Sequence, residues 1–431
     1  MLKAGFARID VTPPLGTFVA GYFERRYASG VLDPIELNAI ALSDEKETVL
    51  LVTADFLGIR AVYTDLIRER IAERIRIPAD HILICSLHQH TSIVLRDDTN
   101  NTVVRDTAYL DVLYRKFCDV AQMAVADMSD TSLLLGERQA DVPISFIRRY
   151  VMKNGEVATN PKLHRVREIV APADRSDNTV RLLRFKRSVG KEIALVNFST
   201  HPDVIGGDRF SADWPGFVRR FVEAEIPNTS CLLVNGAQGD SNHHDRMNGK
   251  REKGYEYSRY MGRVITDSVI ELWDRAVPQE TEAVKAGISD VYQKTRTDGA
   301  ECYEECRKLL DDYDAGAVDR AAVSGAELAR ARRIVNMRTD PIFRRVPVSV
   351  ISLGRVAFVG FGGEPFTHYA TAVREACPDR YIVAVCCANG FEGYLPTAAA
   401  FEEGGYETSG SVFLPSLEQD CVTAATVLLA Q

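Results

Sequence analysis

Apolar residues occur along this chain in short, continuous runs, and each run is followed by a polar segment. Five runs consist almost entirely of aliphatic residues: 49–54, 82–85, 193–198, 231–234 and 356–360. Runs of four to eight apolar residues are typical of strands that are buried on both faces. We therefore expect a β-sheet whose strands lie inside the protein.

Helical patterns lie between these runs. Apolar residues recur at helical spacing among Arg and Glu in 61–76, 106–128 and 254–276, and this spacing predicts an apolar stripe on each helix. Alternating strands and helices are typical of α/β proteins. We therefore predict an α/β fold with a mixed β-sheet core, flanking helices and an active site at the carboxyl ends of the strands.

One region departs from the alternation. Residues 298–338 are charged, rich in Ala and helical in pattern, without a strand signal. We expect a helical excursion there, either a solvated helical hairpin or a lid that gates access to a substrate. Neither a fixed-period repeat nor a long Pro/Gly/Ser linker marks a boundary, so residues 1–431 are predicted to form a single domain with this insertion.

Composition narrows the class of protein. Of 431 residues, 46% are hydrophobic and 26% are charged, a balance that supports a substantial core. The net charge of -8 argues against nucleic acid as the main partner. No apolar run approaches the roughly 20 residues that span a bilayer. The first residues lack the basic and apolar regions of a secretory signal, so a cytoplasmic location is expected.

The nine cysteines also bear on the compartment of the protein. Their number is odd, and several lie within apolar patterns where cysteine behaves as a small hydrophobic residue, so a reducing compartment is the simpler interpretation. Cys302 and Cys306 have a spacing that would place two metal ligands on one helical face. No second pair accompanies them, so helix packing is the simpler explanation.

The histidines give the most specific indication of a functional site. Only eight are present, yet His88 and His90 directly follow the apolar run 82–85, and His201 follows 193–198 and precedes Pro202. Residues i and i+2 of a strand share a face, so we expect both first rings to reach one cavity. Hydrogen-bonded structural histidines are the alternative. Imidazoles from several strand ends can converge on one ion, and zinc takes mainly His, Cys and carboxylate ligands.

Further polar groups follow other strands. A glycine-rich segment, 235–245, follows the run 231–234 and ends in ionisable residues that include Asp240 and His243. It lacks the Lys-Ser/Thr ending of a P-loop, which argues against phosphate binding. Glu364 follows the run 356–360, where it would either cap a helix or bind a metal. Tyr394 and Tyr406 lie in glycine-containing loops, where phenols pack or orient a substrate.

The order of these segments resembles the catalytic domain of the neutral/alkaline, non-lysosomal ceramidase family. The resemblance runs from the opening Ala-Gly-Phe-Ala-Arg-Ile-Asp-Val-Thr-Pro-Pro at 4–14 to about residue 410. Its motifs are His-x-His-Thr-Ser at 88–92, Asn-Phe-Ser-Thr-His-Pro at 197–202, Phe-Ser-Ala-Asp-Trp-Pro-Gly at 210–216, Asn-Gly-Ala-Gln-Gly-Asp at 235–240 and Gly-Gly-Glu-Pro at 362–365. Each motif alone is weak, but five in the family's order are specific.

The resemblance implies a set of site residues. One zinc ion per chain would be held by four ligands, namely His88, His201, Glu364 and Tyr394. His90 would contact the carbonyl of the substrate, and Tyr406 matches a second tyrosine of the family's active site. Arg148 matches a pocket arginine, with Arg149 as the alternative one residue later.

Departures from the family pattern affect the expected substrate. Ceramidases continue the glycine-rich motif with Gly-Asp-Val-Ser-Pro, whereas here Asn242 stands in place of the serine and His243 in place of the proline. Ser241 would recover the serine only if the loop shifts by one residue. The chain is also too short for the C-terminal β-sandwich domain of secreted ceramidases. These differences favour a small, soluble substrate over ceramide.

These observations lead to three hypotheses of function. The first is a zinc-dependent hydrolase that cleaves an amide, or next an ester or lactone, with metal-activated water. His90, Tyr406 and Arg148 would stabilise oxyanion charge, and Asp240 or His243 would move the proton. The second is a metal enzyme acting on a sugar or polyol, and the third is a non-catalytic binding protein with an inherited pocket. The sequence leaves open the oligomeric state, including a homo-oligomer, and the identity of the metal.

Overall fold

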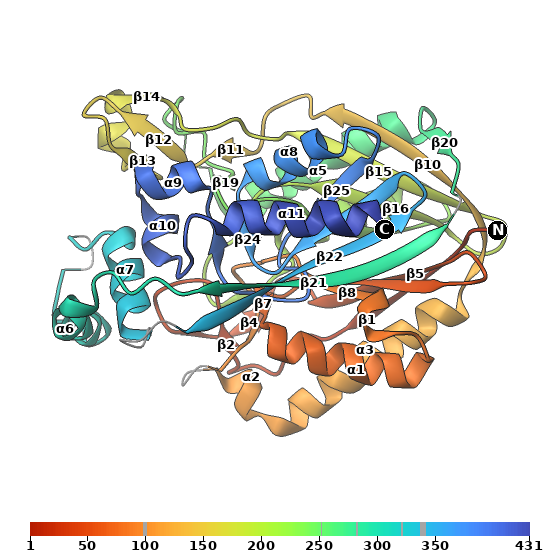
Figure 1. Cartoon of the computed structure of the whole chain (residues 1–431), viewed down its shortest axis with the longest axis horizontal. Coiled ribbons are helices and arrows are strands. Elements are labelled where there is room, and N and C mark those ends of the chain that lie inside the picture. The colour runs from red at the N-terminus through yellow and green to blue at the C-terminus, as the bar shows by residue number, and fades with distance from the viewer. Residues whose placement is uncertain (98–100, 251, 282, 320–321, 337–341) are drawn as a thin grey trace.

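The computed structural model describes residues 1–97, 101–250, 252–281, 283–319, 322–336 and 342–431. Its core holds two β-sheets, covered by helices on their outer faces (Figure 1). The α/β class predicted from the sequence is confirmed. The second sheet, which faces the first, was not predicted.

The larger sheet is mixed. Its strands, in spatial order, are β18 (Thr229–Asn235), β16 (Glu192–Phe198), β15 (Thr179–Arg187), β10 (Ser129–Gln139), β1 (Lys3–Asp10), β5 (Glu36–Ser43), β6 (Thr48–Ala54) and β8 (Ile82–Ser86), with β20 (Val277–Gln279) also paired to β10. The pairs β6–β8 and β16–β18 are parallel, whereas the pairs between them are antiparallel. These parallel pairs use four of the five apolar runs, so that their carboxyl ends carry the functional segments.

The smaller sheet has the order β21 (Val284–Lys294), β22 (Phe343–Leu353), β23 (Val356–Phe361) and β25 (Tyr381–Val385). Its inner residues share one hydrophobic cluster with the larger sheet, in which Leu51 and Leu195 join Phe358 and Val383. Alternation along β6 shows why the strand runs are apolar throughout. Val49 and Leu51 enter this shared cluster, whereas Leu50 and Val52 enter the cluster beneath the helices.

Helices cover the outer faces of both sheets (Figure 1). The larger sheet packs on α1 (Ala61–Ile75) and α3 (Thr107–Ala126) through one cluster, and on α4 (Asp213–Glu225) and α5 (Tyr255–Trp273) through another. The smaller sheet packs on α8 (Thr367–Ala376) and α11 (Leu417–Ala430). The three helices predicted from periodicity are α1, α3 and α5, and their bounds agree to within three residues.

The helical excursion lies at one end of the molecule (Figure 1). It contains α6 (Tyr303–Asp314) and α7 (Gly325–Asn336), and residues 320–321 and 337–338 of the predicted stretch lie outside the described residues. Cys306 packs with Ala331 and Ile334 in a small core of its own. Helix packing therefore explains this cysteine, in agreement with the simpler interpretation of the Cys302–Cys306 spacing.

The excursion also touches the rest of the chain near the candidate site. Helix α7 packs on α10 (Tyr406–Gly410). The Arg332 guanidinium lies 4.5 Å from the ring centre of Phe23, and the Phe23 ring meets the Tyr406 ring edge to face. The predicted excursion thus borders one of the predicted site residues.

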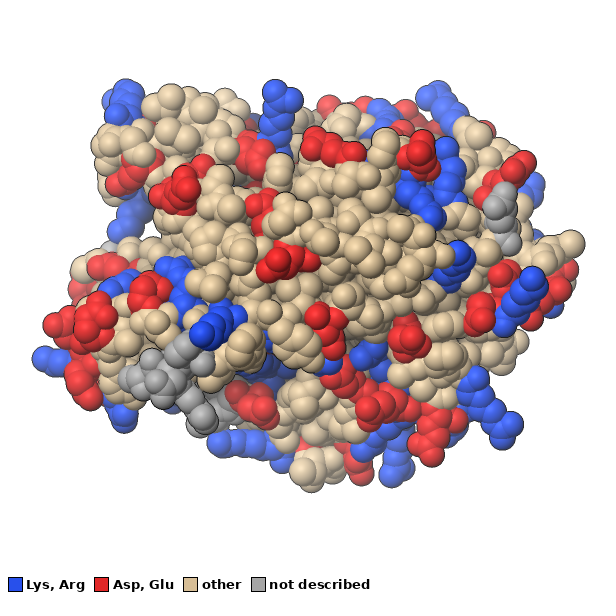
Figure 2. All heavy atoms as spheres, viewed as in Figure 1, with Lys and Arg blue, Asp and Glu red and all other residues tan. Residues whose placement is uncertain are grey.

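Two further features concern the charge on the surface and the character of the helices. Acidic and basic side chains intermingle over the face shown in Figure 2, without a broad patch of one sign on that face. Among the described helices, none combines the length and the apolar character needed to cross a lipid bilayer.

Candidate metal centre

The candidate site lies where strands from both sheets end. His88 follows the end of β8, and His201 follows the end of β16. Glu364 opens the short strand β24 (Glu364–Pro365), which directly follows β23 and pairs in parallel with β26 (Tyr394–Leu395). The register sets Glu364 opposite Tyr394. Four residues far apart in the sequence are therefore brought to one place by strand pairing and strand ends.

The side chains meet closely. Nε2 of His88 and Nε2 of His201 each lie 3.2 Å from Oε2 of Glu364. Nε2 of His90 lies 3.3 Å from Nε2 of His88. His88, His201 and Glu364 are buried, each no more than 3% exposed, so these groups face one another with little access to water.

Backbone carbonyls fix the protonation of two of the rings. Nδ1 of His88 lies 2.7 Å from the carbonyl oxygen of Leu57, and Nδ1 of His201 lies 2.8 Å from that of Gln238. A carbonyl only accepts hydrogen bonds, so each Nδ1 carries the proton and donates it. In the neutral rings, both Nε2 lone pairs then point toward Glu364. Metal-binding histidines are oriented by carbonyl partners of this kind.

This arrangement fits a bound cation. Two nitrogen lone pairs and a carboxylate oxygen repel one another unless a positive charge lies among them, and Oε2 of Glu364 has no hydrogen-bond donor among the described residues. Burial, followed by the charge of Arg148, lowers the pKa of His201 and favours its neutral form. Burial alone would raise the pKa of Glu364, but a positive charge on His88 or His201 would hold it well below its usual range, so the carboxyl is ionised when a cation lies beside it. Imidazole with carboxylate is a donor set that zinc takes.

His90 completes a group of three histidines. The ligand atoms of His88, His90 and His201 all lie within 4.8 Å of one another, so these three rings could hold an ion. The set implied by family resemblance uses Glu364 and Tyr394 in place of His90. The 3.2 Å distances place Glu364 against both histidines, and His90 would then border an ion held there or bind it as a further ligand.

The reason given for the convergence of His88 and His90 was wrong. Strand β8 ends at Ser86, and His88 has a left-handed backbone with φ of 76°. The two rings therefore do not share a face of a strand. A tight loop brings them together, and it is held by a hydrogen bond from the His90 N–H to the carbonyl oxygen of Pro202 (3.0 Å).

Two tyrosines and an arginine line the same site. The Tyr394 ring stacks against that of His201, with 6.3 Å between ring centres, and meets the Tyr406 ring at 5.6 Å. The Arg148 guanidinium lies 5.1 Å from the ring centre of Tyr394. Nη1 of Arg148 also lies 3.5 Å from Nε2 of His201. Burial raises the pKa of both tyrosines, so both phenols keep their protons.

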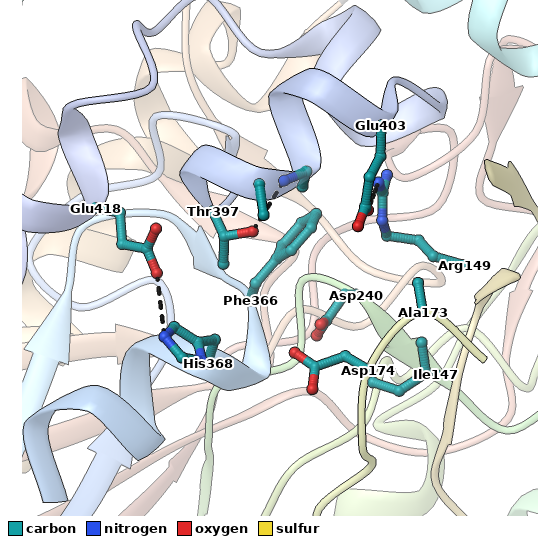
Figure 3. A pocket seen from close by; sticks show the side chains of 12 residues that line it. Ile147, Arg149, Ala173, Asp174, Asp240, Phe366, His368, Thr397, Glu403 and Glu418 are labelled. Atoms are coloured by element: carbon teal, nitrogen blue, oxygen red, sulfur yellow. Dashed lines mark hydrogen bonds and ion pairs between the residues drawn. The ribbon is translucent and has the colours of Figure 1, made fainter. Parts of the chain in front are cut away.

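The choice between Arg148 and Arg149 is clear from the contacts. Arg148 faces the histidines, whereas Arg149 points to a separate cavity of about 170 Å³ that it lines with Asp174, Asp240 and His368 (Figure 3). Glu407 is fully buried between the two, with Oε1 2.8 Å from Nε of Arg148 and Oε2 3.2 Å from Nη1 of Arg149. None of the histidines of the cluster lines this cavity, so the candidate chemistry lies elsewhere.

Residues of the glycine-rich segment take different positions. The Asp240 carboxylate accepts hydrogen bonds from the N–H and the hydroxyl of Thr367 and lines the separate cavity, so it is not placed to move a proton at the histidines. Asn242 donates to the side chain of Asn160. The carbonyl oxygen of Ser241 lies 3.1 Å from Nδ1 of His201, so its backbone supports that ring.

His243 forms a pair that the sequence did not indicate. Its Nδ1 lies 3.1 Å from Oδ1 of Asp203, and the charge of Asp203 is close enough to act on His90 and Tyr22. Asp203 lies two residues after His201. This position beside a histidine at a strand end is the sequence feature that could have identified Asp203 as a site residue. Glu407, directly after Tyr406, was missed as well because an acidic residue in a glycine-containing loop normally faces water.

Close packing explains the glycines. A Cβ at Gly239 would lie 2.3 Å from the carbonyl oxygen of Glu364, and a Cβ at Gly236 would lie 2.1 Å from Oγ of Ser199. The segment therefore passes directly against the backbone of a proposed ligand. Glu364 does not cap a helix, because α8 begins at Thr367 with Phe366 as its N-terminal flanking residue.

Comparison with known proteins gives the fold. Neither a protein-family profile nor a curated protein matches the chain. The crystal structure of a neutral ceramidase from Pseudomonas aeruginosa is similar, with a TM-score of 0.71 and 13% identity over 99% of this chain and 74% of that one. A structure described as ceramidase complexed with C2 has a TM-score of 0.70 and 14% identity over 100% of this chain and 75% of that one. The chain therefore has a ceramidase-like fold, as the resemblance in motifs predicted.

Proposed function

We propose that this protein is a zinc-dependent hydrolase that cleaves the amide bond of a small, soluble N-acyl substrate. The observation that carries the proposal is the convergence of two Nε2 atoms on one carboxylate oxygen, each at 3.2 Å, with both rings oriented by backbone carbonyls. The amide is favoured over other bonds because the fold and the five motifs resemble those of ceramidases.

The proposed ligands are His88, His201, Glu364 and Tyr394. A bound zinc ion would supply Lewis-acid chemistry, polarising a carbonyl group and lowering the pKa of water to about 7. The carbonyl oxygens of Leu57 and Gln238 keep both histidines in the tautomer that presents Nε2. Because the ligands are held before anything binds, little free energy is spent on ordering them.

Other residues would act on the substrate. His90 is partly exposed beside the cluster, and Nδ1 of its ring has no hydrogen-bond partner among the described residues. Tyr406 keeps its proton and lies beside Tyr394. Both groups can donate to an oxygen that gains negative charge, and one such donor contributes about 3 kcal/mol to the stability of a transition state.

Arg148 has a different role in this proposal. Its Nη2 donates to the carbonyl oxygen of Gly239 at 2.7 Å, and its Nε pairs with Glu407. With these donors engaged, the guanidinium is held rigidly against the rings of Tyr394 and Tyr406. We infer that Arg148 positions the tyrosines and keeps the site electropositive. His243 remains as the proposed group that moves a proton, since Asp240 lies at the separate cavity.

An experiment can distinguish an amide from the other bonds that this site could hydrolyse. The same donors and the same ion would serve an ester or a lactone, because all three reactions add water to a carbonyl group. A panel of soluble N-acetyl amides, acetyl esters, lactones and acetylated amino sugars, set against long-chain ceramides, separates these substrates. Hydrolysis of long-chain ceramide in preference to all soluble compounds would contradict the proposal of a soluble substrate.

The metal requirement is tested with one variant and a matched control. His88→Ala should lose most bound zinc and about 1,000-fold or more in kcat/KM, equivalent to about 4 kcal/mol. His164→Ala, which removes an exposed histidine outside the cluster, should keep both. Full activity in metal-free protein would end the proposal. A protein that binds zinc but hydrolyses no member of the panel would instead be a binding protein with this pocket.

A further inference from the structure

One wall of the candidate site consists of His90, Tyr22, Asp203 and His243. The proposed mechanism uses the two histidines but assigns no role to Asp203 or Tyr22. Two backbone contacts tie the wall together: the N–H of His90 donates to Pro202, and Arg26 donates to the carbonyl oxygen of His90 at 2.8 Å. The Tyr22 ring meets the His90 ring edge to face, with 5.5 Å between centres.

This wall is more exposed to solvent than the two histidines proposed as metal ligands. His88 and His201 are fully buried, whereas Tyr22 is 40% exposed and His90 and Asp203 are partly exposed. The Asp203 side chain is 20% exposed although it pairs with His243, a ring that is 1% exposed. Asp203 can therefore be reached from solvent.

The wall also holds polar atoms that lack partners. Nδ1 of His90 and Nε2 of His243 make no hydrogen bond to any part of the chain that the structure describes. Buried polar atoms are satisfied in about nine cases out of ten, so two such atoms in one place point to a ligand. Beside them, the ionised Asp203 carboxylate, whose Oδ1 faces Nδ1 of His243, can only accept hydrogen bonds.

The charged groups around Asp203 favour a ligand that donates hydrogen bonds. The Arg26 side chain is engaged by the carbonyl oxygens of Ala20 and His90. Arg148 is paired with Glu407. These two arginines already have partners, and the ion pair that the structure shows for Asp203 is with His243.

We infer that Asp203 and His243 form a specificity subsite that binds the amine portion of the substrate through a hydroxyl or ammonium group and rejects a carboxylate. The inference rests on the proposed amide hydrolysis and adds the class of amide: N-acyl derivatives of a hydroxylated or cationic amine, not N-acyl amino acids. The Asp203 carboxylate, whose Oδ1 faces His243, takes the donor group of the ligand, and Nε2 of His243 is available to a second one. A carboxylate in the same place would meet Asp203 with like charge.

Four acetamides of matched length provide the test. N-acetylethanolamine carries a hydroxyl, N-acetylethylenediamine an ammonium, N-acetylglycine a carboxylate and N-propylacetamide none of these groups. The zinc-loaded wild-type protein should hydrolyse the first two with kcat/KM about 10- to 100-fold above the plain propyl amide, the range expected for a charge-assisted hydrogen bond. Asp203→Asn should remove that advantage, whereas Asp203→Glu should keep part of it.

The matched control is Asp208→Asn, which removes an exposed carboxylate from the same loop and should leave the preference unchanged. Equal preferences in wild type, Asp203→Asn and Asp208→Asn would overturn the subsite. If Asp203→Asn does not fold, the wild-type series decides. A preference for N-acetylglycine or for the propyl amide then overturns the inference, and a preference for the two donor-bearing amides sustains it.

Calorimetric binding of the same four amides separates this inference from the proposed function. If the zinc-loaded wild type hydrolyses none of them, amide hydrolysis fails. Tighter binding of the hydroxyl and ammonium compounds, lost in Asp203→Asn, would then still support the subsite. Binding that is equal for all four, or undetectable for all four, would overturn the subsite as well.

Discussion

Glu407 allows a quantitative prediction because its carboxylate is buried between two arginines. Its oxygens lie 2.8 Å from Nε of Arg148 and 3.2 Å from Nη1 of Arg149, and Oγ1 of Thr159 donates to it at 2.8 Å. Replacing Glu407 with Gln keeps the size and the acceptor for Thr159 but removes the charge. Two guanidinium groups then remain in a site where Glu407 itself is 0% exposed.

Removing one partner of a buried ion pair costs about 3–5 kcal/mol. Arg148 keeps its bond to Gly239, and Arg149 keeps Glu403 and the carbonyl oxygen of Gly404. We therefore expect a loss near the lower end, about 3 kcal/mol in the free energy of unfolding, measured by urea denaturation at pH 7. Glu403→Gln is the control. Its carboxylate pairs with Arg149 but is 36% exposed, so it should cost less than about 1 kcal/mol.

The pH dependence follows from the same contacts. Burial alone would raise the pKa of Glu407, but Arg148 and Arg149 hold it below its usual range. A depressed folded-state pKa contributes stability above the unfolded value of about 4.3, and this is lost as pH falls through the folded-state value. The difference between wild type and Glu407→Gln should therefore shrink below about pH 4. Equal losses for Glu407→Gln and Glu403→Gln at pH 7 would refute the reasoning.

Two other substitutions test neighbouring features. In Gly239→Ala, the added Cβ would lie 2.3 Å from the carbonyl oxygen of Glu364, so zinc affinity measured by chelator competition should fall about 10- to 100-fold. Gly30→Ala, whose Cβ meets only side-chain atoms of Arg209 at 3.4 Å, should not change it. For Asp240, burial raises the pKa to about 6, so its contribution to stability falls as pH rises from about 4 to 6, by about 3 kcal/mol. Asp240→Asn should remove that decline in urea denaturation series at several pH values, and an unchanged decline would contradict the assignment.

Much of the architecture was predictable because its signals are local. The five apolar runs became β6, β8, β16, β18 and β23, since strands packed on both faces need apolar residues at every position. The face-to-face packing of two sheets was not predictable. Leu195 and Phe358 meet in one core, and no spacing within either strand encodes a partner that lies more than a hundred residues away.

The candidate site also combines features that the sequence predicts with features that it does not. His88, His201 and Glu364 were predictable as candidates because each follows a strand, and the carboxyl ends of strands carry functional groups. Their grouping as ligands of one ion came from the resemblance to the ceramidase motifs. The contacts of Asp203 with His243 and of Glu407 with two arginines depend on loop conformations. The left-handed backbone of His88 also depends on the conformation of a loop. Such details arise from tertiary contacts that sequence periodicity does not carry.

The central claim is that His88, His201, Glu364 and Tyr394 surround one cation. Anomalous diffraction from crystals of the purified protein, recorded on both sides of the zinc absorption edge, tests it most directly. We predict one strong peak per chain within bonding distance of Nε2 of His88, Nε2 of His201 and Oε2 of Glu364. A zinc-saturated crystal without a peak there, or with its peak at other residues, would contradict it.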